Sequence, residues 1–169
     1  MEYQEQRTAY GKFMFKITLN ASKFLMGHMW LYYLLSYTWG LLTTLLGWIG
    51  YLFVRIFLCR KIVDKGKFGP CHWLMFGDKW GGLEMGTNFF IADNMSDYWI
   101  LHTKEHELGH TFQNAVLGPF AIVLVFIPSF IRYWHQEIRE RKHKDNKPYD
   151  LIWFEGSAST IGNVYRITK

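Results

Sequence analysis

Residues 106–110 of this chain, His-Glu-Leu-Gly-His, have types and a spacing that predict metal chemistry. On a helix, His106 and His110 lie one turn apart on the same face, so that one Zn²⁺ ion can reach both imidazoles at about 2.0–2.1 Å. Glu107 lies beside that face, where it can take a proton from a water whose pKa the metal lowers towards about 7. Gly109 leaves room near the metal. The run therefore predicts a catalytic zinc site with Glu107 as general base.

A catalytic zinc ion usually has three protein ligands, so the third must come from elsewhere in the chain. Gln113 and Val116 occupy the positions at which a longer motif would have Gly and a third His, which excludes that pattern. Glu155 is the best candidate, because it lies on an apolar segment expected to be helical. An unpaired carboxylate there would be costly to bury, and a metal ion would compensate it. Pairing of Glu155 with an arginine (Arg132 or Arg139) is the alternative, and Asp150 is the reserve ligand.

Other polar residues near this run have two interpretations each. His102, one turn upstream of His106, is a candidate partner of the metal site or a solvated helix residue. Asn114 is a candidate substrate contact or part of a polar helix face. Arg132 is a candidate for stabilising an oxyanion, although anchoring at a membrane interface fits it equally. Residues 81–86, Gly-Gly-Leu-Glu-Met-Gly, fit either an edge strand that pairs with a peptide substrate or an ordinary hairpin.

The surrounding pattern predicts the elements that would position these residues. A helix is expected from about Tyr98 to Leu117, ended by Gly118 and Pro119. Two short aromatic and β-branched runs, 72–76 and 87–92, lie between glycine-containing turns and predict two or three short strands. An apolar helical pattern over 150–165 carries Glu155. We expect a mainly α fold with a small β-hairpin or short antiparallel sheet.

The longest apolar stretch predicts membrane attachment. Arg55 is the only charged residue between positions 31 and 58. The part from 37 to 58 is long enough to cross the hydrocarbon core of a bilayer, which is about 30 Å thick. We therefore predict one transmembrane helix over 37–58, with a helical hairpin over 24–58 as the variant. Residues 1–36 would form an N-terminal interfacial segment, and residues 59–169 the metal-binding domain.

A second uncharged stretch, residues 120–131, is too short to span a membrane comfortably. It predicts a buried, re-entrant or interfacial element. If it crossed the bilayer, Glu155 would lie on the opposite side from His106 and His110, and one zinc ion could not bind all three. We therefore expect this segment to turn back.

The composition fits a globular domain tethered to a membrane, since half of the residues are hydrophobic and 20% are charged. The net charge of +5 comes with two basic clusters, 55–67 and 139–147, that flank apolar segments. This arrangement fits an anionic membrane face better than a nucleic acid, so no nucleic-acid partner is predicted. Five Lys and Arg in 55–67, against three in 12–23, predict that the metal-binding domain is cytoplasmic. Cys59 and Cys71 are expected to be reduced.

The run 106–110, with Glu155 and the following Ala158, resembles the gluzincin-type zinc peptidases. The resemblance implies a minimal zincin-like domain in which His106, His110 and Glu155 bind zinc and Glu107 is the general base. Gluzincins often have an Asp four residues after the glutamate ligand, where this chain has Ser159. Over roughly 37–162 the chain also resembles a family of small bacterial membrane proteins, which implies a bacterial or phage-associated origin and the inner membrane. The stretches that carry this second resemblance are Gln113-Asn114, Gly118-Pro119, Pro128-Ser129, Arg132-Tyr133-Trp134 and Trp153-Phe154-Glu155-Gly156.

These patterns predict a membrane-associated zinc metallopeptidase that cleaves peptides or proteins, with membrane proteins among the candidates. Two alternatives stay open. One is a non-catalytic, zinc-stabilised membrane adaptor, in which a fourth protein ligand such as His102 closes the site. The other is a zinc hydrolase of a non-peptide substrate.

Overall fold

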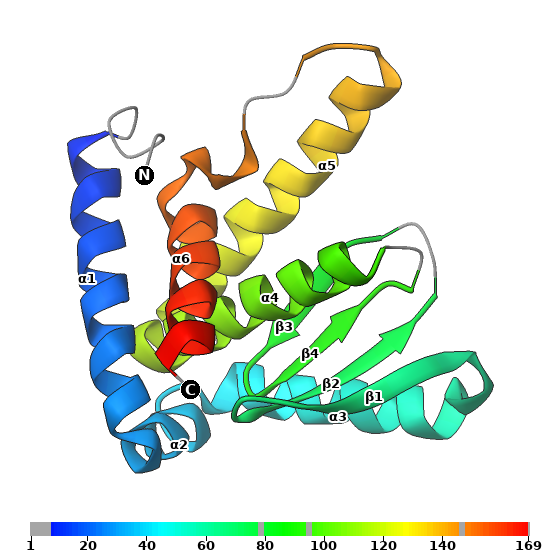
Figure 1. Ribbon diagram of the computed structural model, residues 1–169, viewed down its shortest axis with the longest axis horizontal. Coiled ribbons are helices and arrows are strands. Elements are labelled where there is room, and N and C mark those ends of the chain that lie inside the picture. The colour runs from blue at the N-terminus through cyan, green and yellow to red at the C-terminus, as the bar shows by residue number, and fades with distance from the viewer. Residues whose placement is uncertain (1–7, 78–79, 94–95, 146–147, 169) are drawn as a thin grey trace.

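Figure 1 shows a computed structural model of the chain, which describes residues 8–77, 80–93, 96–145 and 148–168. Among these residues, three α-helices precede a small sheet and three follow it. In chain order the elements are α1 (Ala9–Gly27), α2 (Met29–Tyr37), α3 (Leu41–Phe57), η1 (Cys59–Lys61), β1 (Ile62–Phe68), β2 (Cys71–Phe76), β3 (Gly82–Met85), β4 (Asn88–Ile91), α4 (Asp97–Leu117), the π-helical η2 (Ile122–Phe126), α5 (Ile127–Arg141), η3 (Tyr149–Leu151) and α6 (Trp153–Thr168).

The helices expected around the metal-binding run are confirmed. Helix α4 covers the predicted range and is capped by Gly118, whose φ of 57° lies in the left-handed region. Glycine is the residue that adopts this conformation most readily, so it ends the helix here. The predicted C-terminal helix is α6, which starts at Trp153 after the short η3 turn.

The sheet has four strands in the order β1-β2-β4-β3 among the described residues. The strands expected at 72–76 and 87–92 are confirmed as β2 and β4. The expectation of a purely antiparallel sheet is wrong, because β2 and β4 pair in parallel while the two outer pairs are antiparallel. All four residues of β4 are buried, which fits a central strand. The chain places β3 at the edge before returning through β4.

The sheet lies between α4 on one face and α3 on the other, and the side chains of its central strands alternate accordingly. Phe89 and Ile91 pack in one cluster with Phe112 of α4. Phe90, which lies between them in β4, packs with Val54 of α3. This layering holds α4 along the sheet surface, so that one side of α4 faces β3.

Helices α4 and α6 cross very closely, and two glycines make the approach possible. A Cβ added at Gly109 would lie 2.0 Å from the Ala158 carbonyl oxygen, and one at Gly162 would lie 1.9 Å from that of Glu105. The expectation that Gly109 leaves room near the metal is therefore wrong. The position that a Cβ would occupy on Gly109 faces the backbone of α6.

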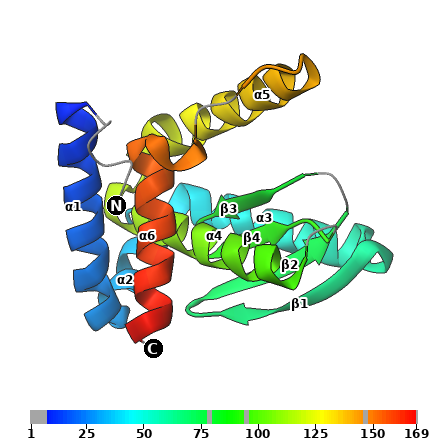
Figure 2. The same ribbon diagram turned by 45° about the horizontal axis from the view of Figure 1, so that its top comes forward.

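The described part of the N-terminal segment packs on the rest of the molecule. Helix α1 lies along α6 (Figures 1 and 2), and Leu25 and Met26 at its end belong to the main core. Thr18 is fully buried, with its hydroxyl 3.4 Å from that of Ser157. The prediction of an interfacial segment over 1–36 did not include this packing against the rest of the protein.

The predicted continuous helix over 37–58 is broken in the structure. Helix α2 ends at Tyr37 and α3 begins at Leu41, with an angle of 84° between them. Thr38 and Gly40 leave the helical conformation, and the Thr38 hydroxyl donates to the Leu34 carbonyl at 2.6 Å. Within the described residues, no helix taken alone is both long enough and apolar enough to cross a membrane. The bent pair α2 and α3 meets those two criteria together.

The uncharged stretch 120–131 forms a helical segment that runs through η2 into α5. The expectation that it is buried or turns back is wrong for the described residues, and of the three alternatives the interfacial element stays open. Phe120, Val123 and Phe130 are each more than half exposed, and the chain reverses only after Arg141. Figure 2 shows α5 projecting away from the sheet before the chain returns to α6.

Candidate metal centre

Three potential metal ligands meet where α4 and α6 cross. The Nε2 atoms of His106 and His110 are 3.1 Å apart, and Oε2 of Glu155 lies 3.1 and 3.2 Å from them. Two atoms bonded at about 2.0–2.1 Å to one tetrahedral zinc ion are separated by about 3.3 Å. These three side chains therefore fit a single zinc ion, and they are the ones that the sequence predicted.

Hydrogen bonds to the other ring nitrogens orient both imidazoles. Nδ1 of His110 lies 2.8 Å from Oε1 of Gln113, whose amide nitrogen donates to the Phe154 carbonyl and the Ser157 hydroxyl, each at 2.7 Å. Because that amide nitrogen faces α6, its oxygen faces His110, and Nδ1 of His110 carries the proton. In the neutral ring, the lone pair on Nε2 is then directed into the cluster, as a metal ligand requires.

A longer relay holds His106. Its Nδ1 lies 2.9 Å from the Ser159 hydroxyl, and that hydroxyl donates to Oδ1 of Asp150 at 3.1 Å. Asp150 is therefore not in the ligand cluster, which corrects its place as reserve ligand. It instead supplies a carboxylate to His106 through the Ser159 hydroxyl.

Glu155 is fully buried and has hydrogen-bond partners on both carboxylate oxygens. The Ser129 hydroxyl donates to Oε1 at 2.5 Å, and the Tyr149 hydroxyl is 3.2 Å from that of Ser129. Burial would raise the pKa of Glu155, but the hydrogen bonds from the two histidines outweigh it and hold this pKa well below its usual range.

The arginines proposed as partners of Glu155 bind elsewhere. Arg132 donates to the carbonyls of Pro148 and Tyr149, and Arg139 donates to the carbonyl of Asp145. The role proposed for Arg132 at an oxyanion is not supported by this geometry. Arg132 instead joins α5 to η3 and positions Tyr149, whose ring centroid lies 5.4 Å from its guanidinium carbon.

The site gathers acidic side chains in a buried place, where a negative charge is costly. Glu84 and Glu107 lie close to the histidines, and burial raises the pKa of both, that of Glu84 to about 8. Burial would lower the pKa of His110, but its hydrogen bond to Glu155 and the three nearby carboxyls raise it to about 9. The described residues around the pocket include no Lys or Arg. A bound divalent cation would balance this charge, which is a second observation that fits a metal.

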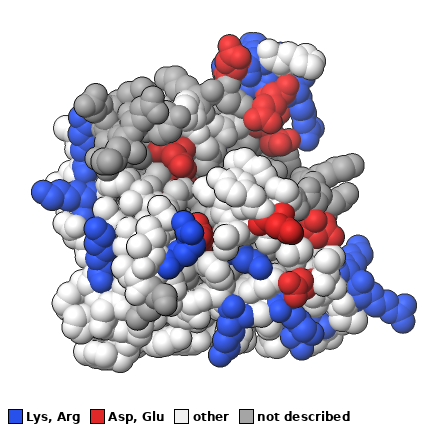
Figure 3. Space-filling view, in the orientation of Figure 1, with Lys and Arg blue, Asp and Glu red and all other residues white. Residues whose placement is uncertain are grey.

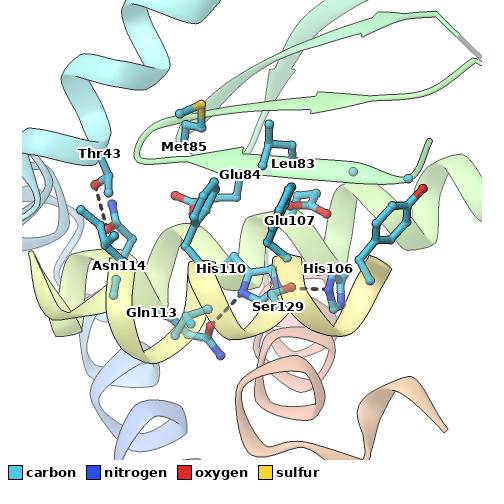
Figure 4. Close-up of a pocket in the computed structure, with 18 of the residues that line it drawn as sticks. Thr43, Leu83, Glu84, Met85, His106, Glu107, His110, Gln113, Asn114 and Ser129 are labelled. Atoms are coloured by element: carbon cyan, nitrogen blue, oxygen red, sulfur yellow. Dashed lines mark hydrogen bonds between the residues drawn. The ribbon is translucent and has the colours of Figure 1, made fainter. Parts of the chain in front are cut away.

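The cluster forms one wall of a cavity of about 310 Å³. Figure 4 shows Glu107 projecting from α4 towards β3, which carries Leu83 and Glu84, while His106 and His110 lie side by side near Ser129. Glu107 reaches so close to β3 that a Cβ at Gly82 would lie 2.2 Å from its Oε1. The remaining walls come from η2, α5 and the start of α3. Because the histidines face this cavity, the cluster is open on one side.

The structure separates the other predicted residues. His102 stacks against Tyr98 and Trp99 and lies outside the group of described residues that can share one metal. Asn114 lines the cavity, but its Oδ1 accepts a hydrogen bond from Thr43 at 2.8 Å, so it also joins α4 to α3 (Figure 4).

Three residues at the site were not assigned a role there from the sequence: Ser129, Tyr149 and Glu84. Glu84 was only part of a candidate edge strand. The signal for Ser129 was its place next to Pro128 in a stretch that resembles other proteins. No sequence pattern marks Tyr149, because it lies in a polar loop region far along the chain from His106. In the structure the centroids of these two rings are 6.2 Å apart.

Comparison with models of known protein families, with curated proteins and with solved structures finds no match to this chain. The resemblance to gluzincins and to small bacterial membrane proteins therefore stays a prediction, and the function rests on the geometry of the site.

Proposed function

We propose that this protein is a membrane-associated zinc metallopeptidase. The observation that carries the proposal is the meeting of two Nε2 atoms and one carboxylate oxygen at the wall of an open cavity that Glu107 also lines. Zinc held by His106, His110 and Glu155 would supply Lewis acidity and lower the pKa of water at the site.

Glu107 is the proposed general base. It lies in the same cavity wall as the ligands but belongs to the next position on α4, so that its carboxylate faces β3 and the cavity. Burial raises its pKa, while the charges of His106 and His110 oppose this effect. A base with a pKa nearer to neutrality accepts a proton from the attacking water and returns it to the leaving amine more readily.

Tyr149 is the proposed donor to the substrate carbonyl oxygen. Its hydroxyl lies beside Ser129 in the cavity wall, and burial together with the negative charge of Glu155 raises its pKa, so the hydroxyl stays protonated. Because Ser129 donates to Glu155, the Tyr149 O–H donates to Ser129 in this structure. A substrate carbonyl that replaced Ser129 as its acceptor would have the charge that develops on its oxygen during attack stabilised. Arg132 holds Tyr149 in position through the backbone.

Strand β3 favours a peptide over other substrates. It is one of the two edge strands of the described sheet, where it pairs only with β4, and residues 81–85 line the cavity. An extended peptide can add to such an edge through backbone hydrogen bonds, which places its carbonyl groups along the wall opposite α4. The zinc hydrolase of a non-peptide substrate has no comparable observation in its favour.

The zinc-stabilised adaptor is less well supported, because it needs a fourth protein ligand in place of water. His102 does not reach the cluster. We propose the bacterial inner membrane as the location, with the metal-binding part on the cytoplasmic face, on the basis of the basic clusters and the resemblance.

Metal content and proteolysis, measured together, test the proposal. The detergent-purified wild type and Glu107→Gln should each bind one zinc per chain, and Glu155→Ala should lose it. Only the wild type should cleave an unstructured protein substrate, and a chelator should remove that activity. Absence of zinc from the wild type would refute the proposal, and cleavage by Glu107→Gln at the wild-type rate would remove the general base.

A further inference from the structure

Two helices carry apolar stripes that face away from the protein. On an ordinary surface helix the outward face is polar, and the apolar face is buried. Helix α3 buries one side against the sheet, and the helical segment η2–α5 buries only Val125 of η2. Both also expose apolar side chains at helical spacing. The exposed residues are Leu42, Leu45, Leu46, Ile49, Leu52, Phe53 and Ile56 on α3, and Val123, Ile127, Phe130, Ile131, Trp134 and Ile138 on η2–α5.

These two stripes continue into the cavity over the metal centre. Leu46, Phe126, Phe130 and Trp134 line the cavity and are also between 36% and 57% exposed on the surface. The rim of the cavity is therefore made of the same apolar residues as the stripes. A polar, extended peptide arriving from water would have to pass this apolar rim, whereas a chain already in a lipid environment would not.

Basic residues lie where the stripes end. Arg55, Arg60 and Lys61 are exposed at the end of α3, and Arg141 and Lys142 are exposed at the end of α5. Figure 3 shows Lys and Arg near both of these ends, together with Asp and Glu at the end of α5. Apolar stripes that finish in basic clusters are complementary to a bilayer leaflet with anionic headgroups.

We propose that an anionic bilayer leaflet covers these two stripes, and that the cavity opens into it and receives its substrate from it. The substrate class is then a membrane-inserted polypeptide whose residues around the cleaved bond are apolar and extended. This inference rests on the proposed peptidase function and adds the route of substrate entry. Strand β3 would pair with the segment once its apolar side chains had entered between Leu46 and Phe130.

The test compares one apolar peptide in two forms, free in solution and anchored by an added transmembrane segment in vesicles of phosphatidylethanolamine and phosphatidylglycerol. The stripe variant Ile49→Glu/Ile131→Glu changes two residues that are 64% and 61% exposed and do not line the cavity. The matched control Val63→Glu/Ile167→Glu changes two similarly exposed residues on β1 and α6, outside both stripes. Zinc content and flotation with the vesicles are measured for all three proteins.

The wild type and the control should float with the vesicles and cleave the anchored peptide at least about tenfold faster than the free one, a difference of about 1.4 kcal/mol. The stripe variant should keep its zinc and its cleavage of the free peptide, but lose flotation and the preference for the anchored form. Equal cleavage of both forms by the wild type, or equal losses in variant and control, would overturn the inference. If the wild type floats and binds zinc but cleaves neither form, the peptidase proposal fails and the entry route fails with it. Loss of flotation only in the stripe variant would then still establish the bilayer surface.

Discussion

The relay from Asp150 through Ser159 to His106 can be tested separately from the zinc ligands and from the general base, through its effect on zinc affinity. In the wild type, the Ser159 hydroxyl donates to Oδ1 of Asp150 at 3.1 Å. An Asn side chain at position 150 can still accept this hydrogen bond, so Asp150→Asn removes only the charge. Ser159→Ala removes the hydroxyl that lies 2.9 Å from His106 Nδ1 in the wild type, and with it the link between Asp150 and His106. Zinc affinity should therefore fall in both variants, and further in Ser159→Ala.

The size of these losses follows from the role of such partners, which is to orient the ring and raise its basicity. Removing a group that holds a ligating histidine lowers metal affinity by about 10–100-fold, or about 1.4–2.7 kcal/mol. We expect zinc affinity to fall about tenfold in Asp150→Asn and about 100-fold in Ser159→Ala. Loss of Glu155 should be larger than both, because it removes a ligand.

Competition with a chromophoric zinc chelator measures all of these affinities on one scale. Asp64→Asn is the matched control, since it removes the same charge from an exposed position on β1 and should leave zinc affinity unchanged. An affinity of Ser159→Ala within about twofold of the wild type would refute the relay. A loss in Asp150→Asn as large as that in Glu155→Ala would mean that Asp150 binds the metal directly.

Three further predictions concern the base, the helix crossing and pH. Glu107→Gln should lower the rate of peptide cleavage by about 10²–10⁴-fold while leaving zinc bound, as turnover and metal analysis of the same sample will show. Gly109→Ala should lower the free energy of unfolding by about 1–3 kcal/mol in a urea titration, because its Cβ meets the α6 backbone. Gly27→Ala, which has open space, should be neutral or stabilising. In the metal-free protein, the pKa of His110 is raised from 6.5 to about 9 and that of Glu84 from 4.5 to about 8, so the folded state binds more protons than the unfolded chain between those values. Stability without metal should therefore fall as the pH rises from about 5 to about 9, and urea midpoints that rise over this range would contradict the assignment.

Much of the metal centre could be predicted from the sequence because its main rule is local. The four-residue spacing of His106 and His110 fixes their common face once α4 is a helix, and the segment 98–117 carries clear start and stop signals. Glu155 was predictable for an energetic reason, since an acidic residue within an apolar helix requires a partner. The prediction still depended on the two helices meeting, which no local pattern specifies.

The parts that could not be predicted depend on contacts between distant segments. The break between α2 and α3 follows from Thr38 and Gly40, which a hydropathy window reads as part of one apolar run. Strand β1 lies within the basic stretch 55–67, whose charges favoured a membrane-flanking interpretation over a strand. The parallel pairing of β2 with β4 is a property of sheet order, and short apolar runs do not distinguish it from a hairpin.

The same limit explains why the surroundings of the apolar stretch 120–131 stayed open between three alternatives. Its lack of charge predicted a buried, re-entrant or interfacial element, because hydropathy reports only the preference of a segment for an apolar surrounding and not which surrounding it finds. In the structure, Val123 and Ile131 face outward, so protein packing does not provide it. We propose a bilayer as that surrounding, and the exposure of this segment supports the membrane proposal.

The helix crossing connects the fold to the chemistry. His106 and His110 are placed by one helix, but Glu155 comes from another, so the distance between the two helix axes sets whether one ion can bind all three. Protein metal sites keep their bond lengths to within about 0.2 Å. A methyl group at Gly109 or Gly162 would displace a backbone by considerably more. These glycines therefore act as spacers between the ligand-bearing helices. It follows that Gly109→Ala should lower zinc affinity as well as stability, and that zinc should no longer raise the unfolding midpoint of this variant as far as it raises that of the wild type.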